Sequence, residues 1–166
     1  MHMLISLHHP FPEAALTPAG LCDMLKTTDL NAWASEQARL LRERRFDDID
    51  AQGIADEIED VGKSEQRELA SRMAVLLAHL LKWDMQAQRR GSSWQATIRA
   101  QRKEIAYALL ESPSLKPKLT EPLWVDMVWS NAVAAAMTET GIETFPDACP
   151  WSLETQALKE DWWPGA

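Results

Sequence analysis

Two ionisable side chains interrupt a strongly apolar segment near the middle of the chain. The stretch Arg72–Trp83 reads RMAVLLAHLLKW, so Arg72 and His79 lie seven residues apart. On a helix this spacing places both side chains on one side, two turns apart. A histidine titrates near neutral pH while an arginine keeps its charge, and together they have the chemistry to bind a phosphate and transfer a proton. Arg72 and His79 are therefore candidate catalytic residues.

The pair resembles the Arg-x(4–6)-His signature of HEPN-type ribonucleases, at the long limit of that spacing and with Met73 after the arginine. A structural interpretation competes with it. The segment has the apolar face of a core helix, and Arg72 has Glu68 four residues before it as an ion-pair partner. On that interpretation His79 is a partly or wholly buried imidazole bonded to protein groups, with Glu57 or Glu68 as its expected acidic partner.

A run of carboxylates precedes this helix. Residues 47–60 contain seven acidic side chains and no basic one. Clustered carboxylates can bind a metal ion, and carboxylate-bridged bundles combine them with Glu-x-x-His on facing helices. The chain has no Glu-x-x-His. A solvated acidic face is the favoured interpretation, so we expect no metal and no cofactor, and keep a carboxylate-metal enzyme as the third hypothesis.

Cations gather in the following stretch, residues 82–103. Its predicted basic patch consists of Lys82, Arg89, Arg90, Arg99 and Lys103. The interleaved aromatic residue, Trp94, would suit RNA or a phosphorylated ligand. The whole chain, however, has 25 acidic and 17 basic residues and a net charge of -8, which gives no long-range attraction to nucleic acid. Ion pairing with the acidic segment is the alternative that we favour.

Arg102 belongs to the same stretch but lies beside an apolar helical stripe. The stripe includes Ile98 and Ile105. A guanidinium buried there needs a partner, because an unpaired buried charge is costly. The sequence predicts that Glu57 supplies the carboxylate, as a structural buried ion pair.

Helical periodicity extends through most of the chain, and no segment alternates with a period of two. We predict an all-α fold, a bundle of about five or six helices, with a long central helix over 65–87 and a break or kink at Gly62. Residues 1–27 are expected to be an irregular extension, with Met24 as an alternative start, and residues 28–166 a single helical domain. The other predicted helices span 29–44, 50–61, 94–111 (capped by Ser92 or Ser93), 122–140 and a short segment after Ser152.

The predicted helix at 122–140 is apolar nearly all round. Such a helix is either central in a bundle or covered by a second chain. We expect an interface, to another protein or to a second copy, that uses Val125, Trp129 and Ala136.

Several motifs in a fixed order are also familiar. WASEQARLLR from Trp33, IADEIEDVG from Ile54, HLLKW from His79 and FPDACPW from Phe145 together resemble the bacterial family known as domain of unknown function 29 (DUF29). The resemblance covers roughly residues 29–164. It implies an all-helical bacterial protein, and because the family has no established activity it assigns no catalytic residue.

The function favoured by these observations is a non-catalytic protein-interaction module. The alternative is a metal-independent HEPN-type ribonuclease that uses Arg72 and His79. The sequence contains no run of about 18 apolar residues, so we expect no membrane span. Two distant cysteines, Cys22 and Cys149, are expected to be reduced thiols in a cytoplasmic protein.

Overall fold

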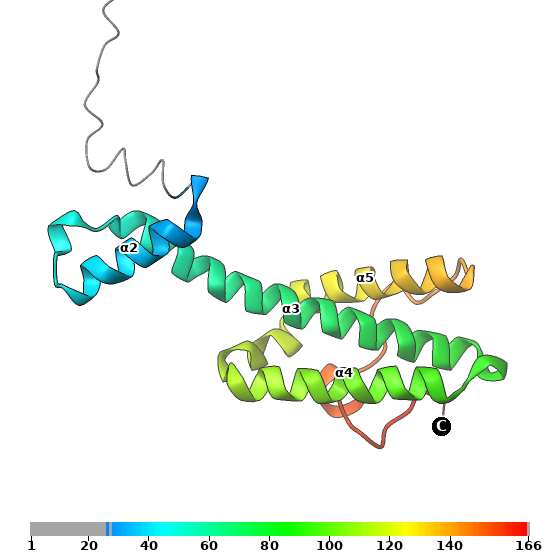
Figure 1. The fold of residues 1–166 in the computed structure, drawn as a ribbon. Coiled ribbons are helices and arrows are strands. Elements are labelled where there is room, and N and C mark those ends of the chain that lie inside the picture. Colours follow the sequence, from blue (N-terminus) through cyan, green and yellow to red (C-terminus); the bar gives the residue numbers. More distant parts are fainter. Residues whose placement is uncertain (1–25, 27, 166) are drawn as a thin grey trace, which may run out of the picture. The chain divides into compact units, whose positions relative to one another are not determined.

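The computed structural model describes residue 26 and residues 28–165, and these residues are mostly helical (Figure 1). No strand occurs among them, so the predicted all-α class is confirmed. The predicted extension at 1–27 and the alternative start Met24 lie outside the described residues, Lys26 excepted. In chain order, the elements are α2 (Leu30–Arg42), η1 (Phe46–Asp48), α3 (Ala51–Met85), η2 (Ala87–Arg89), α4 (Ser92–Glu111), η3 (Pro113–Thr120), α5 (Pro122–Thr140) and η4 (Leu153–Ala157).

The chain divides into two compact units, and the first ends at residue 61. Its small core contains Trp33 and Leu40 from α2. The side chain of Gln37 accepts a hydrogen bond from the Asp50 N–H at 2.8 Å, which joins α2 to the start of α3. Asp50 in turn caps α3 by accepting from the Gly53 N–H at 2.8 Å. A Cβ atom at Gly53 would collide with the capping Asp50 carboxylate and lie 2.9 Å from the Trp33 ring, so any other residue there would displace the cap.

Helix α3 runs through Gly62 without interruption for 35 residues. The predicted break was wrong because glycine lowers helix stability by only about 1 kcal/mol and does not by itself end a helix. A C-terminal glycine cap needs a left-handed backbone, and Gly141, which ends α5, has φ 71°. Gly62 has no positive φ and no steric demand for glycine.

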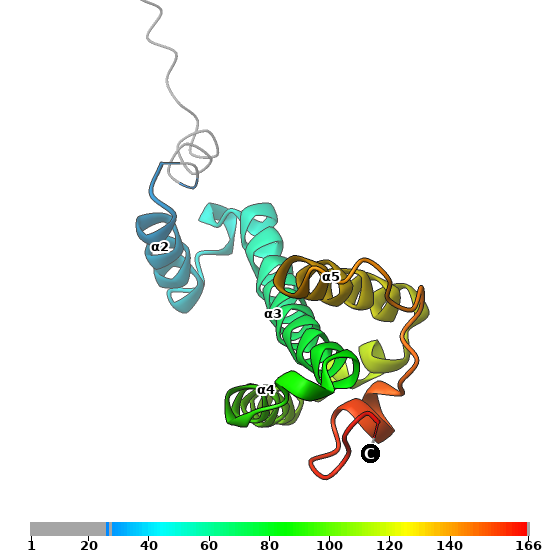
Figure 2. The ribbon, with the colours of Figure 1, turned by 90° about the vertical axis from the view of Figure 1, so that its right-hand side faces the viewer.

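The second unit, residues 62–165, has its core along α3. Met73, Leu76, Leu77 and Leu80 are fully buried. Helices α4 and α5 lie on different sides of this part of α3 (Figures 1 and 2). Each buried side chain of this size contributes about 1.5–3 kcal/mol, so the row on α3 is a main source of stability.

The beginning of α4 differs from the prediction. Gly91, rather than Ser92 or Ser93, is the N-cap residue, and it has an extended backbone and no side-chain bond. The segment after α4 also turns, as η3, which buries Leu115 and Leu119. The prolines in this segment ended the predicted helix, but they are compatible with a short 3₁₀ turn.

The segment after α5 packs back on the second unit. Ser152 caps η4, as predicted, and accepts from the Thr155 N–H at 3.2 Å. Trp151 meets Trp129 of α5 edge to face at 5.8 Å between ring centroids. Near the C-terminus Trp163 lies 4.6 Å from the Trp83 ring of α3. Aromatic contacts therefore hold the C-terminal segment at two places.

Candidate functional site

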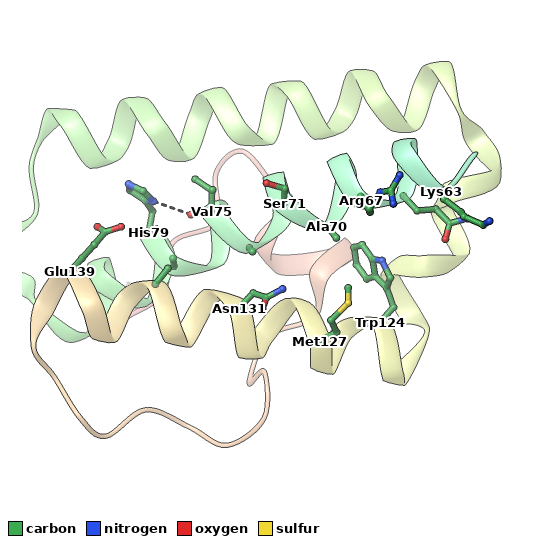
Figure 3. A pocket seen from close by; sticks show the side chains of 14 residues that line it. Lys63, Arg67, Ala70, Ser71, Val75, His79, Trp124, Met127, Asn131 and Glu139 are labelled. Carbon is green, nitrogen blue, oxygen red and sulfur yellow. Dashed lines mark hydrogen bonds between the residues drawn. The ribbon is translucent and has the colours of Figure 1, made fainter. Parts of the chain in front are cut away.

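A groove of about 690 Å³ follows α3 and α5 in the second unit (Figure 3). We call it the α3–α5 groove. Nine residues of α3 and five of α5 line it: Lys63, Gln66, Arg67, Ala70, Ser71, Ala74, Val75, Ala78, His79, Trp124, Met127, Asn131, Ala135 and Glu139. The two helices run in the same direction along it, so each end of the groove has contributions from both.

Several side chains on the α3 side of the groove are small and protrude little from the helix. Ala70, Ala74 and Ala78 recur every four residues, which is one ridge of a helix. Val75 and Met127 line the groove as partly exposed apolar residues, at 37% and 45% exposure. Ala70 and Ala78 are themselves buried, at 8% and 2% exposure, so Val75 and Met127 supply the accessible apolar surface of the groove.

The two ends of the groove differ in charge. Lys63 and Arg67 lie at the end where Trp124 enters, and His79 and Glu139 lie at the other end (Figure 3). The Glu139 carboxylate accepts from the Lys82 ammonium group, whose side chain is only 4% exposed. One end is therefore cationic, and the other has a carboxylate already paired with a buried cation.

His79 is half-buried at the second end. Its Nδ1 lies 2.9 Å from the Val75 carbonyl oxygen, which can only accept, so Nδ1 carries the proton. Nε2 then accepts from the Lys82 ammonium at 3.3 Å. Burial lowers the pKa of His79, and the charge of Lys82 adds to that shift, while the Val75 carbonyl and the charge of Glu139 oppose it. The predicted bonding to protein groups is confirmed, but the expected carboxylate partner was wrong: the Val75 carbonyl and the Lys82 ammonium bond the ring instead.

Arg72 makes separate contacts. Its Nε lies 2.7 Å from Glu68 Oε1, which confirms the expected i, i+4 pair, and its Nη1 lies 3.7 Å from Glu104 of α4. Arg72 does not line the groove that His79 lines. Among the described residues, the structure therefore brings the two candidate catalytic side chains to different partners.

Arg102 of α4 holds the C-terminal segment. It is 5% exposed, as predicted, and its Nε donates to the Ala157 carbonyl at 2.8 Å. Its Nη1 and Nη2 donate to the carbonyls of Glu160 at 3.1 Å and Trp162 at 2.7 Å. Burial lowers the pKa of this guanidinium, and Asp161 and Glu160 oppose that shift from a longer range.

The predicted Glu57–Arg102 pair is corrected by these contacts. Backbone carbonyls take the place of the carboxylate, because they can satisfy a guanidinium without burying a second charge. Glu57 itself is 3.4 Å from Lys26 in the first unit, an ion pair that the sequence reasoning did not include.

A family model described as domain of unknown function DUF29 matches residues 25–163. The chain belongs to the DUF29 family. The resemblance found in the sequence is thereby confirmed. No curated protein and no solved structure matches the chain. The description of the family assigns no activity, so the function of this DUF29 protein has to be inferred from its geometry.

The predicted basic patch of the DUF29 chain is not one surface. Lys82 is buried against Glu139, and its ammonium lies 5.3 Å from the Trp94 ring. Arg90 donates to the Trp83 carbonyl at 2.7 Å. Arg89, Arg99 and Lys103 are exposed. The ion pair of the buried Lys82 with the half-exposed Glu139 was missed in the sequence because 57 residues separate its members.

The predicted interface residues lie inward. Trp129 is 1% exposed, Ala136 is fully buried, and Val125 packs against the core. Trp129 also donates its indole N–H to the Pro146 carbonyl at 2.9 Å. They are part of the bundle core, and the prediction of a partner surface there is corrected. The exposed apolar residues of α5 are Leu123, Met127 and Met137.

Two further features are absent from the described residues. Among them, no group of three or more His, Cys, Asp or Glu side chains is arranged to hold a metal ion. None of the helices described has the length and apolar character needed to cross a bilayer. Cys149 is a free thiol that donates to the Trp151 carbonyl at 3.3 Å, and burial raises its pKa.

Proposed function

We propose that this DUF29 protein is a non-catalytic interaction module whose α3–α5 groove receives an amphipathic helix from a partner protein. The observation that carries the proposal is the groove itself: about 690 Å³, with small residues on the α3 side and apolar residues between two charged ends. Helix-in-groove binding is a recurring mode of protein recognition.

The length of the groove fits a helix. From Lys63 to His79, α3 rises by about 24 Å at 1.5 Å per residue. A partner helix of about four turns would cover that distance with apolar side chains at every third or fourth position. The exposed side chains of Val75 and Met127 would contact those apolar side chains from the two helices of the groove.

The charges at the ends favour one orientation. A partner helix would place carboxylates near Arg67 and Lys63, and the helix end that lies there would be its N-terminus, where acidic residues are favoured. The C-terminal end would then approach Glu139, which suits basic side chains. The expected partner is thus a helix that is acidic at its start and basic at its end.

The bacterial cytoplasm is the setting that we propose. Cys149 is a free, half-buried thiol, as is usual in a reducing compartment. Labelling of the unfolded chain with a thiol reagent, after isolation under acid quench, would find Cys149 reduced. A Cys149 that resists labelling until a reductant is added would contradict this setting.

A display library of helical peptides tests the proposal. Peptides of about sixteen residues, with fixed apolar positions at helical spacing and the rest varied, would be selected against the full chain. We expect enrichment of sequences with an acidic start. Ala135→Trp fills the groove from α5, and Ala134→Trp adds the same exposed ring outside it. The first variant should reduce peptide affinity at least tenfold, whereas the second should leave it unchanged.

Other occupants give different results. If wild-type protein is a dimer by light scattering and Ala135→Trp is a monomer, the groove binds a second copy and the partner-helix proposal fails. If an anilinonaphthalene dye loses binding in Ala135→Trp while no peptide discriminates the two variants, the groove accepts a small apolar ligand instead. Equal peptide affinity for both tryptophan variants would also overturn the proposal. Arg67→Glu should weaken the acidic-start peptides about tenfold, and Arg89→Glu, away from the groove, should not.

A further inference from the structure

A second cavity, of about 400 Å³, lies between α4 and the C-terminal segment. Its α4 side consists of Arg99, Arg102, Lys103 and Ala106, which follow one helix face, and its other side consists of Leu158 and Glu160. We call it the basic cavity. Three cations and one carboxylate line it, so the cavity is locally basic in a chain whose net charge is -8.

We infer that the basic cavity binds the phosphate group of a small phosphorylated molecule. This inference goes beyond the proposed function, because the cavity is separate from the α3–α5 groove and shares no lining residue with it. Its volume lies within the range of about 300–1,000 Å³ that is usual for small-molecule sites.

Arg102 supplies the part of the proposed phosphate site that is held in a fixed position. A guanidinium has five N–H groups, and three of those in Arg102 donate to the carbonyls of Ala157, Glu160 and Trp162. One N–H on each terminal nitrogen has no acceptor among the described residues. Those contacts fix the guanidinium of Arg102, a residue that is 5% exposed, so little side-chain entropy is lost when an anion binds.

Arg99 and Lys103 add exposed positive charge at the rim. They lie four residues apart on either side of Arg102, and both are exposed. A phosphate carries more than one negative charge and several acceptor oxygens, so it can engage a fixed guanidinium and two rim cations together. A carboxylate has fewer acceptors and a single charge, and would bind less well.

The rest of the cavity suits an organic group. Ala106 and Leu158 provide apolar surface. The Glu160 carboxylate would repel a second anion but can accept a hydrogen bond from a hydroxyl. The ligand class that fits is a phosphate ester with a hydroxylated organic part, as in a sugar phosphate.

Calorimetric titration of the full chain tests the inference. The probes are inorganic phosphate, glycerol phosphate and acetate at one constant ionic strength. We expect glycerol phosphate to bind at least as tightly as inorganic phosphate and acetate to bind least. Phosphate should also raise the melting temperature, because a ligand that binds only the folded state stabilises it.

Two double variants localise the binding. Arg99→Gln with Lys103→Gln removes the rim charges, and we expect phosphate affinity to fall about tenfold. Arg89→Gln with Lys116→Gln removes two exposed cations that do not line the cavity, so affinity should be retained. Equal affinity in both double variants, or acetate binding as strong as phosphate, would overturn the inference.

The last measurement is the binding of a single-stranded RNA oligonucleotide to wild type and to both double variants. If RNA binds and both double variants weaken it equally, the cations act as a dispersed polyanion surface and the small-molecule site is refuted. If neither phosphate probe binds wild type, the inference fails as well. Because Arg99 and Lys103 are exposed, both double variants should fold normally, which circular dichroism would verify.

Discussion

The two sides of α3 in the second unit are covered by other segments of the chain to different degrees. On the side of α4, the C-terminal segment packs back on the core, and Arg102 and Trp163 hold it by hydrogen bonds and ring contacts. On the side of α5, larger residues of the α3–α5 groove such as Val75 and Met127 stay exposed, although Ala70 and Ala78 beside them are buried. The chain thus uses its own C-terminal segment as a packing partner on one side and leaves the other side accessible.

The difference shows what each side depends on. The covered side is stabilised by contacts between residues 55 to 60 positions apart, so its stability depends on a few anchoring side chains. The open side keeps its form through the core beneath it, in which Met73 and Val128 are fully buried. Substitutions at the anchors should therefore affect folding, whereas substitutions in the groove should affect binding.

The largest effect is expected at Arg102. Arg102→Gln removes the donors of three backbone carbonyls, and we expect the free energy of unfolding to fall by roughly 3 kcal/mol. Urea denaturation measures the loss, and a red shift in tryptophan fluorescence would report release of the C-terminal segment. Arg99→Gln, on the same helix but exposed, is the matched control and should cost less than about 0.5 kcal/mol. Similar losses in the two variants would contradict an anchoring role.

A smaller effect is expected at the open side, in the pair of Lys82 and Glu139. Glu139→Gln leaves a nearly buried ammonium without its carboxylate and should cost about 1–2 kcal/mol, since Glu139 is half exposed. Lys82→Met removes the charge, keeps most of the apolar stem and should cost less than about 1 kcal/mol. Equilibrium unfolding of both variants gives the comparison. If Lys82→Met is the more destabilising variant, the Lys82 ammonium stabilises the fold through more than its pairing with Glu139.

Local signals in the sequence predicted much of this fold. The predicted helices at 29–44 and 122–140 correspond to α2 and α5. Asp29 caps the start of α2, Pro122 begins α5 and Gly141 ends it, and such caps depend on neighbouring residues alone. Gly62 was misread because the same residue type is tolerated inside a helix that packing stabilises. Cap chemistry therefore locates the ends of helices better than glycine content does.

The sites were harder to predict because their partners are remote. The burial of Arg102 followed from its place on an apolar stripe, but its carbonyl partners belong to a segment more than 50 residues away. A carbonyl is present at every residue, so no side-chain pattern could identify them. The row of Ala70, Ala74 and Ala78 was the available signal for the α3–α5 groove, yet small residues also occur in tightly packed helices.

The smallest expected effect is the pH dependence of His79. Burial lowers its pKa below the usual value of about 6.5, so the unfolded chain binds the proton more readily than the folded one. The contribution of His79 to stability is therefore complete above the unfolded pKa and is lost as the pH falls through the folded pKa. An NMR titration of the imidazole resonances should find one histidine with a depressed pKa, and that resonance should be missing in His79→Gln. The variant should also lose stability less steeply than wild type as the pH decreases from 7. If the His79 pKa is instead raised above its usual value, the Val75 carbonyl and the charge of Glu139, which favour the protonated ring, outweigh burial and the charge of Lys82.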